Sequence, residues 1–220
     1  MAVLSILDIA AGTGMLSVGV KLALESIGLR ADVVGGCERD ACAAAAFLEV
    51  MEHAQGFRPP VWDDARTFVG RRDRGLESVD FLTAGYPCQP FSTAGNRAGG
   101  RDPRHLWPAI RRIVARIKPG IVFFENVDGH ISLGLGKVLR DLERLGYSAT
   151  CGVFSAEEVG APHLRKRVFV LGLSDTDQQR WAKGQAEQPL RQGRRKAVGR
   201  VCELDDAELS GIRSESGRNW

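Results

Sequence analysis

The sequence predicts an α/β fold built on a doubly wound, mostly parallel sheet. Short apolar runs rich in Val, Ile, Leu and Phe alternate along the chain with longer segments whose apolar residues recur every three to four positions. The chain has 220 residues, of which 44% are hydrophobic and 26% are charged, so it can bury the core of one ordinary domain with or without a tail. Two full enzyme domains do not fit in this length.

The apolar runs are the predicted strands, and the segments between them are the predicted helices. The strands are Leu4–Ile9, Asp32–Cys37, Val79–Thr83, Ile121–Phe124 and Val168–Leu171, with the alternating segment Tyr147–Phe154 as one more. The helices are Met15–Ile27, Arg39–Glu52, Pro103–Lys118 and Leu133–Leu145. Gly28, Pro119 and Gly146 follow three of these helices and are typical stop signals.

The composition changes after Ser174. Residues 175–220 are rich in Gln, Arg, Gly and Glu, and only Ala207–Ile212 has the pattern of a regular element. We therefore divide the chain into a folded domain, residues 1–174, and a polar segment, residues 175–220, which is either a linker or the start of another region.

Charge, apolar runs and cysteine usage exclude several classes of protein. No apolar run reaches the roughly 20 residues of a membrane helix, and the N-terminus has no basic leader, so we expect a cytoplasmic protein without a membrane partner. Five cysteines without a C-x-x-C pair argue against a disulfide scaffold and a zinc ribbon, and no metal is expected. A net charge of +3 is compatible with a nucleic-acid partner.

A glycine loop follows the first predicted strand. Gly12 and Gly14 let the backbone turn sharply and approach a ligand, and Glu38 at the end of the second strand places a carboxylate beside the loop, where such folds bind ribose hydroxyls. The third glycine of the dinucleotide fingerprint is absent, because Ser17 stands there, so the site favours an adenosyl group over a pyrophosphate. The alternative is a plain structural turn.

A cysteine flanked by prolines follows the third predicted strand. Cys88 lies between Pro87 and Pro90 on a loop that leaves the carboxyl end of a parallel strand, which is where α/β folds place ligands. The stretch Thr93–Arg104 that follows has the composition of a mobile basic loop able to close over an anionic substrate.

Two more polar groups are predicted at the same edge of the sheet. Glu125 and Asn126 follow the apolar run Ile121–Phe124, and Glu125 suits a proton donor there, although it could instead cap the next helix. In an extended chain Arg165 and Arg167 share one face and could hold a base carbonyl or phosphates; a solvated basic turn is the alternative.

In order and spacing, these segments resemble the C5-cytosine DNA methyltransferases over Leu4–Leu173. The resemblance rests on the cofactor loop Asp8–Met15, Glu38, Asp64 in Trp62-Asp63-Asp64-Ala65, Pro87-Cys88-Gln89-Pro90-Phe91-Ser92, Leu106, Glu125-Asn126-Val127 and His163-x-Arg165-x-Arg167. It implies the S-adenosylmethionine-dependent, Rossmann-like fold, and it implies a DNA (cytosine-5-)-methyltransferase with S-adenosyl-L-methionine as cofactor and double-stranded DNA as partner.

The resemblance also assigns roles to individual residues. Cys88 is the expected nucleophile at cytosine C6, Glu125 the group at N3 and the exocyclic amine, and Arg165 and Arg167 the groups on the O2 side. The expected cofactor-binding residues are Asp8, Ala10, Gly12, Gly14, Glu38, Asp64, Pro87 and Leu106, and the expected substrate-binding residues are Gln89, Ser92 and Asn126. The target base must be flipped out of the duplex to reach this site.

The sequence also departs from the family pattern. Ala10 stands where a phenylalanine is usual, Met15 where a glycine is usual, and His163 where a glutamine is usual. Residues 175–220 resemble neither a target recognition domain nor the family's final motif, so we expect a truncated or split enzyme that needs a complementing chain. The alternatives are a fragment that binds cofactor without methylating and an RNA cytosine-C5 methyltransferase.

Overall fold

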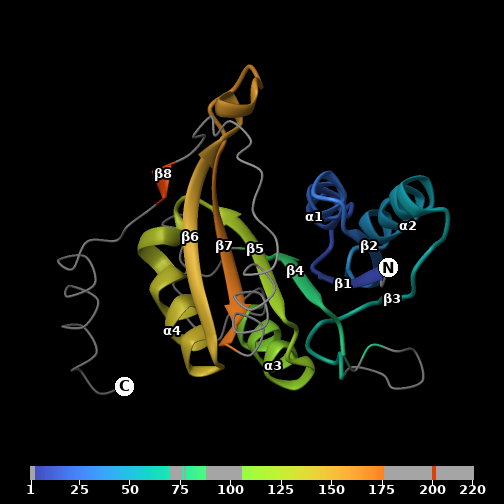
Figure 1. The fold of residues 1–220 in the computed structure, drawn as a ribbon, viewed down its shortest axis with the longest axis horizontal. Helices are drawn as coiled ribbons and strands as arrows, with labels where there is room; N and C mark the ends of the chain where they lie inside the picture. Colours follow the sequence, from blue (N-terminus) through green and yellow to red (C-terminus); the bar gives the residue numbers. More distant parts are fainter. Residues whose placement is uncertain (1–2, 70–75, 77, 88–105, 176–199, 202–220) are drawn as a thin grey trace.

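A computed structural model of the chain describes residues 3–69, 76, 78–87, 106–175 and 200–201. Its centre is one eight-stranded sheet in the order β3-β2-β1-β4-β5-β7-β6-β8 (Figure 1). The strands are β1 Val3–Ile9, β2 Arg30–Cys37, β3 Val61–Trp62, β4 Phe81–Gly85, β5 Ile121–Val127, β6 Tyr147–Ser155, β7 Lys166–Ser174 and β8 Arg200–Val201. The α/β fold with a mostly parallel sheet is therefore confirmed.

The sheet is parallel from β3 to β5, and β7 then runs antiparallel to both of its neighbours, β5 and β6. The predicted strand Val168–Leu171 belongs to β7, so its direction differs from that of a simple parallel repeat. The link from β6 to β7, residues 156–165, is shorter than the dozen or more residues that a parallel crossover needs. A link of this length can therefore join β6 and β7 only as antiparallel neighbours.

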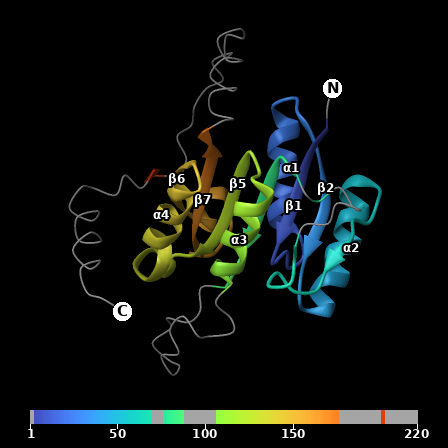
Figure 2. The ribbon, with the colours of Figure 1, turned by 90° about the horizontal axis from the view of Figure 1, so that it is seen from below.

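In the part of the chain that the structure describes, four α-helices cover the two faces of the sheet. They are α1 Met15–Ser26, α2 Ala41–Gln55, α3 Trp107–Ile117 and α4 Gly136–Arg144. Helices α1 and α2 lie over the β1–β2 end and pack on Ile6 and Val33, whereas α3 and α4 lie over the β5–β6 end in a second cluster that contains Leu7 and Leu82 (Figures 1 and 2). Neighbouring residues of β1 thus serve opposite faces, as the two-residue period of a strand requires.

The helix boundaries differ from the predicted ones for local reasons. Helix α2 begins at Ala41 because Asp40 is its N-cap, with a carboxylate oxygen that accepts a hydrogen bond of 2.8 Å from the Ala43 backbone N–H. The segment predicted as one helix from Leu133 starts as a π-helix, η3 Ile131–Leu135, and continues as α4.

Two short strands were not predicted. Both β3 and β8 have only two residues, which is too few to show an alternating pattern. Strand β8 pairs with β6 and lies in the segment for which no strand was expected, while the predicted element Ala207–Ile212 lies outside the described residues. Within the part of the chain that the structure covers, no helix is long and apolar enough to cross a membrane.

Candidate active site

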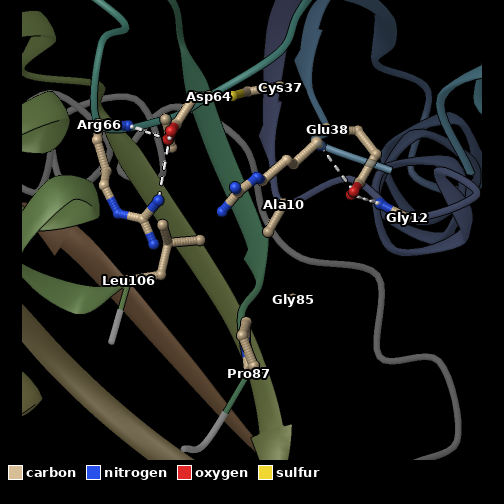
Figure 3. A pocket seen from close by; sticks show the side chains of 11 residues that line it. Ala10, Gly12, Cys37, Glu38, Asp64, Arg66, Gly85, Pro87 and Leu106 are labelled. Carbon is tan, nitrogen blue, oxygen red and sulfur yellow. Dashed lines mark hydrogen bonds and ion pairs between the residues drawn. The ribbon is translucent and has the colours of Figure 1, made fainter. Parts of the chain in front are cut away.

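The loop after β1 is tied to the end of β2 by the Glu38 carboxylate. Glu38 Oε2 accepts a hydrogen bond of 2.8 Å from the Gly12 backbone N–H (Figure 3). Its Oε1 accepts from the N–H groups of Arg39 and Asp40 at 2.8 and 2.9 Å. A carboxylate has about four lone-pair positions, so Glu38 keeps capacity for a ligand hydroxyl. The loop itself turns through positive φ angles at Ala10 (53°) and Gly12 (54°).

The two loop glycines serve different purposes. A Cβ added at Gly12 would meet nothing within 4 Å, so its surroundings are open. A Cβ at Gly14, where φ is 82°, would lie 2.6 Å from Met51 Cε and 2.7 Å from Phe47 Cδ2. Gly14 is therefore required for close packing of α1 on α2, and Gly12 is the glycine that faces the ligand side.

Most of the predicted cofactor residues line one cavity of about 320 Å³ at the carboxyl edge of the parallel strands. Six of them do so: Ala10, Gly12, Glu38, Asp64, Pro87 and Leu106 (Figure 3). Gly14 and Asp8, also predicted, are not among the lining residues. Sequence reasoning missed five that are: Cys37, Arg39, Ala65, Arg66 and Gly85.

Arg66 is held by one of the predicted acids. Asp64 accepts hydrogen bonds from the Arg66 backbone N–H at 2.9 Å and from its guanidinium at 3.3 Å. Figure 3 shows this pair on the side of the cavity away from Glu38 and Gly12. The signal for both missed arginines was their position one or two residues after a predicted acid, Arg39 after Glu38 and Arg66 after Asp64.

Asp8 lies beneath the loop rather than in the cavity. Its side chain is 0% exposed, and neither carboxylate oxygen has a hydrogen-bond partner among the described residues. Burial raises its pKa to about 7; the Ser17 and Thr83 hydroxyls oppose the rise, and the Glu38 charge adds to it. Those two hydroxyls donate instead to the backbone oxygens of Gly14 and Leu7.

An ion pair joins the predicted residues Glu125 of β5 and Arg167 of β7. Arg167 Nε lies 2.6 Å from Glu125 Oε1, and an added Cβ at Gly85 would lie 3.6 Å from Glu125 Oε2. Gly85 lines the cavity, whereas Glu125 and Arg167 do not, so the ion pair lies next to one lining residue of the cavity. Glu125 lies inside β5 and does not cap the helix that follows.

The family model described as C-5 cytosine-specific DNA methylase matches residues 4–215. The chain belongs to this family. The match extends past Leu173, where the resemblance in the motifs stops, and so includes most of the polar segment, although the division at residue 174 remains a prediction.

The methylase chain spans about half or less of the curated relatives that it matches. It is 35% identical to Type II methyltransferase M.HhaI of Haemophilus parahaemolyticus over 76% of this chain and 48% of the relative. It is 30% identical to Type II methyltransferase M.BanI of Aneurinibacillus aneurinilyticus over 76% of this chain and 37% of the relative.

The two solved structures compared below are each 17% identical to this chain, so they show its fold and nothing about its function. A mutant of Spodoptera frugiperda DNMT2 aligns with a TM-score of 0.62 and 17% identity over 90% of this chain and 55% of the other. A Listeria monocytogenes protein classed as a class I S-adenosylmethionine-dependent methyltransferase aligns with a TM-score of 0.55 and 17% identity over 96% and 63% of the two chains. The fold of the chain is thus that of S-adenosylmethionine-dependent methyltransferases.

The structure places some of the remaining predicted residues and leaves others undescribed. Arg165 is exposed and precedes β7, with its backbone N–H bonded to His163 O at 3.1 Å, so the extended alternation that was predicted begins only at Lys166. Asn126 is buried, and its Nδ2 donates to Tyr86 O at 2.9 Å. Cys88, Gln89, Ser92 and the basic stretch Thr93–Arg104 lie outside the described residues.

The other described cysteines do not resemble nucleophiles. Cys37 and Cys151 are buried, and Cys42 is exposed. Burial raises the pKa of Cys37 to about 12, and the charges of Asp64, Glu38 and Asp63 act in the same direction. The Cys37 thiol therefore packs in the cavity wall as a neutral group. Within the described ranges, no group of three or more His, Cys, Asp or Glu side chains could hold a metal ion.

Proposed function

We propose that this chain carries the catalytic part of a DNA (cytosine-5-)-methyltransferase that uses S-adenosyl-L-methionine. The observation that carries the proposal is the Glu125–Arg167 ion pair of 2.6 Å beside Gly85, because Gly85 lines a cavity together with six residues predicted to bind the cofactor. Membership of the C-5 cytosine-specific DNA methylase family supports the same activity.

The cavity fits the adenosyl part of the cofactor. Its volume of about 320 Å³ is at the lower end of the range for small-molecule sites, roughly 300 to 1,000 Å³. Ala10, Pro87 and Leu106 offer apolar surface to a purine, and the carboxylates of Glu38 and Asp64 offer acceptors for hydroxyl and amine groups. When bound, S-adenosyl-L-methionine supplies an electrophilic methyl group for C5 of cytosine.

The protein's task is to make C5 nucleophilic. The Cys88 thiolate adds to C6 of the base, and Glu125 binds N3 and the exocyclic amine so that negative charge does not accumulate on the ring. Arg167 holds Glu125 in place and contacts the O2 side, where Arg165 is a second cation. Loss of the C5 proton and cleavage of the bond between sulfur and C6 then restore the ring and free Cys88.

The substrate is proposed to be cytosine in double-stranded DNA, flipped out of the helix so that C5 and C6 are accessible. Gln89, Ser92 and Asn126 remain the proposed substrate-side residues. We also propose a second partner, a complementing chain that carries a recognition region.

Covalent trapping tests the proposal directly. Duplex DNA carrying 5-fluorocytosine is incubated with the chain and S-adenosyl-L-methionine, with and without the recognition half of a relative, and covalent complexes are counted on denaturing gels. We expect complexes that depend on Cys88 and are absent in Cys88→Ser. Glu125→Gln should slow trapping by roughly 10²-fold, the scale for a positioned acid, whereas Glu157→Gln, a change at an exposed glutamate of η4 Ala156–Val159, should not.

Other outcomes separate the alternatives. Trapping only on RNA that carries 5-fluorocytidine would replace DNA by RNA as the substrate. Calorimetric binding of S-adenosyl-L-methionine without trapping under any condition would identify a cofactor-binding fragment. A covalent complex that survives Cys88→Ser would refute the assigned nucleophile.

A further inference from the structure

The residue that precedes Pro87 and Cys88 is held at its backbone, its ring and its hydroxyl. Tyr86 is 4% exposed and follows β4 directly. Its backbone oxygen accepts a hydrogen bond of 2.9 Å from Asn126 Nδ2, and its hydroxyl shares one of 3.1 Å with His130 Nε2. We call Tyr86, Asn126 and His130 the Tyr86 clamp.

The ring of Tyr86 is fixed as well. It packs against Trp107 at a centroid distance of 5.9 Å and against Phe124 at 6.3 Å, and His130 meets it edge-on at 5.6 Å and 87°. Aromatic pairs at such distances and angles add specific orientation to the area they bury. Tyr86 therefore has little freedom to rotate or shift while His130 stays in place.

The local sequence makes room for His130. The ring is 7% exposed and lies at the start of the π-helix η3 Ile131–Leu135, a wider turn that is frequent at functional sites. A Cβ at Gly134 would lie 2.7 Å from His130 Cε1, so the glycine is needed for the ring to occupy this position. The burial of the His130 ring, the wider turn of the π-helix and the lack of a side chain at Gly134 all keep the ring in this position.

We propose that His130 is a positioning residue for the Cys88 nucleophile and that it acts through the hydroxyl of Tyr86. The proposal rests on the function proposed above, in which Cys88 attacks cytosine. Tyr86 is two residues before Cys88, and its backbone oxygen is held by the residue next to Glu125. A single rigid group thereby fixes the start of the nucleophile segment relative to the catalytic acid, and misplacement of a reacting group by about 1 Å can cost 10²-fold in rate.

Three substitutions disturb the clamp in different ways. Tyr86→Phe removes the hydroxyl, His130→Phe removes its partner, and Gly134→Ala displaces the imidazole without removing a polar group. His130→Gln is the conservative variant, because a glutamine amide can reach the hydroxyl. Tyr147→Phe is the matched control: Tyr147 is equally buried, and its hydroxyl donates to Pro119 O at 2.6 Å before β5 begins, at the opposite edge of the sheet.

The first readout is trapping on 5-fluorocytosine DNA, measured per folded molecule. We expect Tyr86→Phe, His130→Phe and Gly134→Ala each to slow trapping about tenfold, the double variant of Tyr86→Phe and His130→Phe to be no slower than either single one, and His130→Gln to recover most of the rate. The dissociation constant of S-adenosyl-L-methionine should change less than twofold. Equal losses in Tyr147→Phe would mean a merely structural role and would overturn the proposal.

The second readout does not need methylation. The pH–rate profile of iodoacetamide alkylation is followed at Cys88 by peptide mass spectrometry, with exposed Cys42 as the internal reference. A change in the position of the Cys88 thiol changes the pKa of that thiol, so the Cys88 midpoint should move by half a pH unit or more in the three clamp variants and stay fixed at Cys42. Absence of wild-type trapping would count against the proposed function alone, whereas unchanged Cys88 profiles in all three variants would refute the clamp.

Discussion

Replacement of Asp8 by asparagine should remove a pH dependence from the stability of this protein. The Asp8 side chain is fully buried, and its pKa is raised from the ordinary 3.8 to about 7, mainly by burial. The native state therefore keeps the Asp8 proton up to about pH 7, whereas the unfolded chain releases it near pH 4. Between these limits the native state binds more protons, so its stability falls as the pH rises and stops falling above pH 7.

The size of the effect follows from the two pKa values. At about 1.4 kcal/mol for each pKa unit, the whole penalty is about 4 kcal/mol, and the part that develops between pH 5 and pH 8 is about 2.5 kcal/mol. An asparagine at this position would carry no charge at any pH. Any packing cost of the asparagine changes the free energy of unfolding by the same amount at every pH. The pH dependence of the difference between the two proteins therefore reports the ionisation of Asp8 alone.

Urea unfolding followed by tryptophan fluorescence at pH 5, 6, 7 and 8 measures both proteins. We expect the free energy of unfolding of Asp8→Asn minus that of the wild type to grow by about 2.5 kcal/mol over this range. Asp63→Asn, a change at an exposed aspartate, should run parallel to the wild type. If the Asp8→Asn difference stays constant within about 0.5 kcal/mol, burial does not hold the Asp8 proton and the reasoning is wrong.

Three further substitutions test other parts of the structure. Glu38→Ala frees the Gly12 N–H and should weaken S-adenosyl-L-methionine binding in calorimetry by about tenfold or more, and unchanged affinity would contradict the proposed cofactor site. Gly14→Ala should lower the free energy of unfolding by at least about 2 kcal/mol more than Gly12→Ala, because only the former adds a clash to a positive φ; equal losses in urea unfolding would contradict this. Asp141→Ala leaves the buried Trp107 Nε1 without its 2.9 Å partner and should cost about 3 kcal/mol by the same measurement, and a loss under about 1 kcal/mol would contradict it.

The cavity in which we propose that the cofactor binds could largely be predicted from the sequence, because six of its lining residues follow from local rules. Strand ends place Glu38 and Pro87 at one edge, and a glycine loop must turn where Gly12 stands. The same rules could not separate Gly12 from Gly14, since the difference depends on the packing of α2 against α1. Asp8 was assigned to the cofactor for its place in a motif, although it lies in the part of β1, Ile6–Ile9, in which every residue is buried.

The Tyr86 clamp could not have been found from the sequence. Tyr86 and His130 are 44 positions apart, and neither belongs to an alternating or helical pattern that would bring them together. A lone histidine in an apolar segment has no distinctive spacing, and the π-helix after it breaks the 3.6-residue period on which helix prediction depends. Only the pairing of β4 with β5 places these two side chains in contact.

The direction of β7 explains why a basic motif at the start of a strand meets an acid at the end of another. Carboxyl ends of parallel strands share one edge, so Glu125, near the end of β5, lies beside Gly85 at the end of β4. Had β7 been parallel to them, Arg167, its second residue, would lie at the opposite edge, some 15 Å or more away for strands of this length. The antiparallel register instead pairs Arg167 with Val127 and Phe169 with Glu125, which sets the Arg167 side chain diagonally across from the Glu125 carboxylate on one face. Arg167 lies at the start of its strand, whereas Gly85 and Glu125 lie at the ends of theirs, so these residues can meet at one edge of the sheet only if β7 is antiparallel to β5. The short link between β6 and β7 makes β7 antiparallel in this chain.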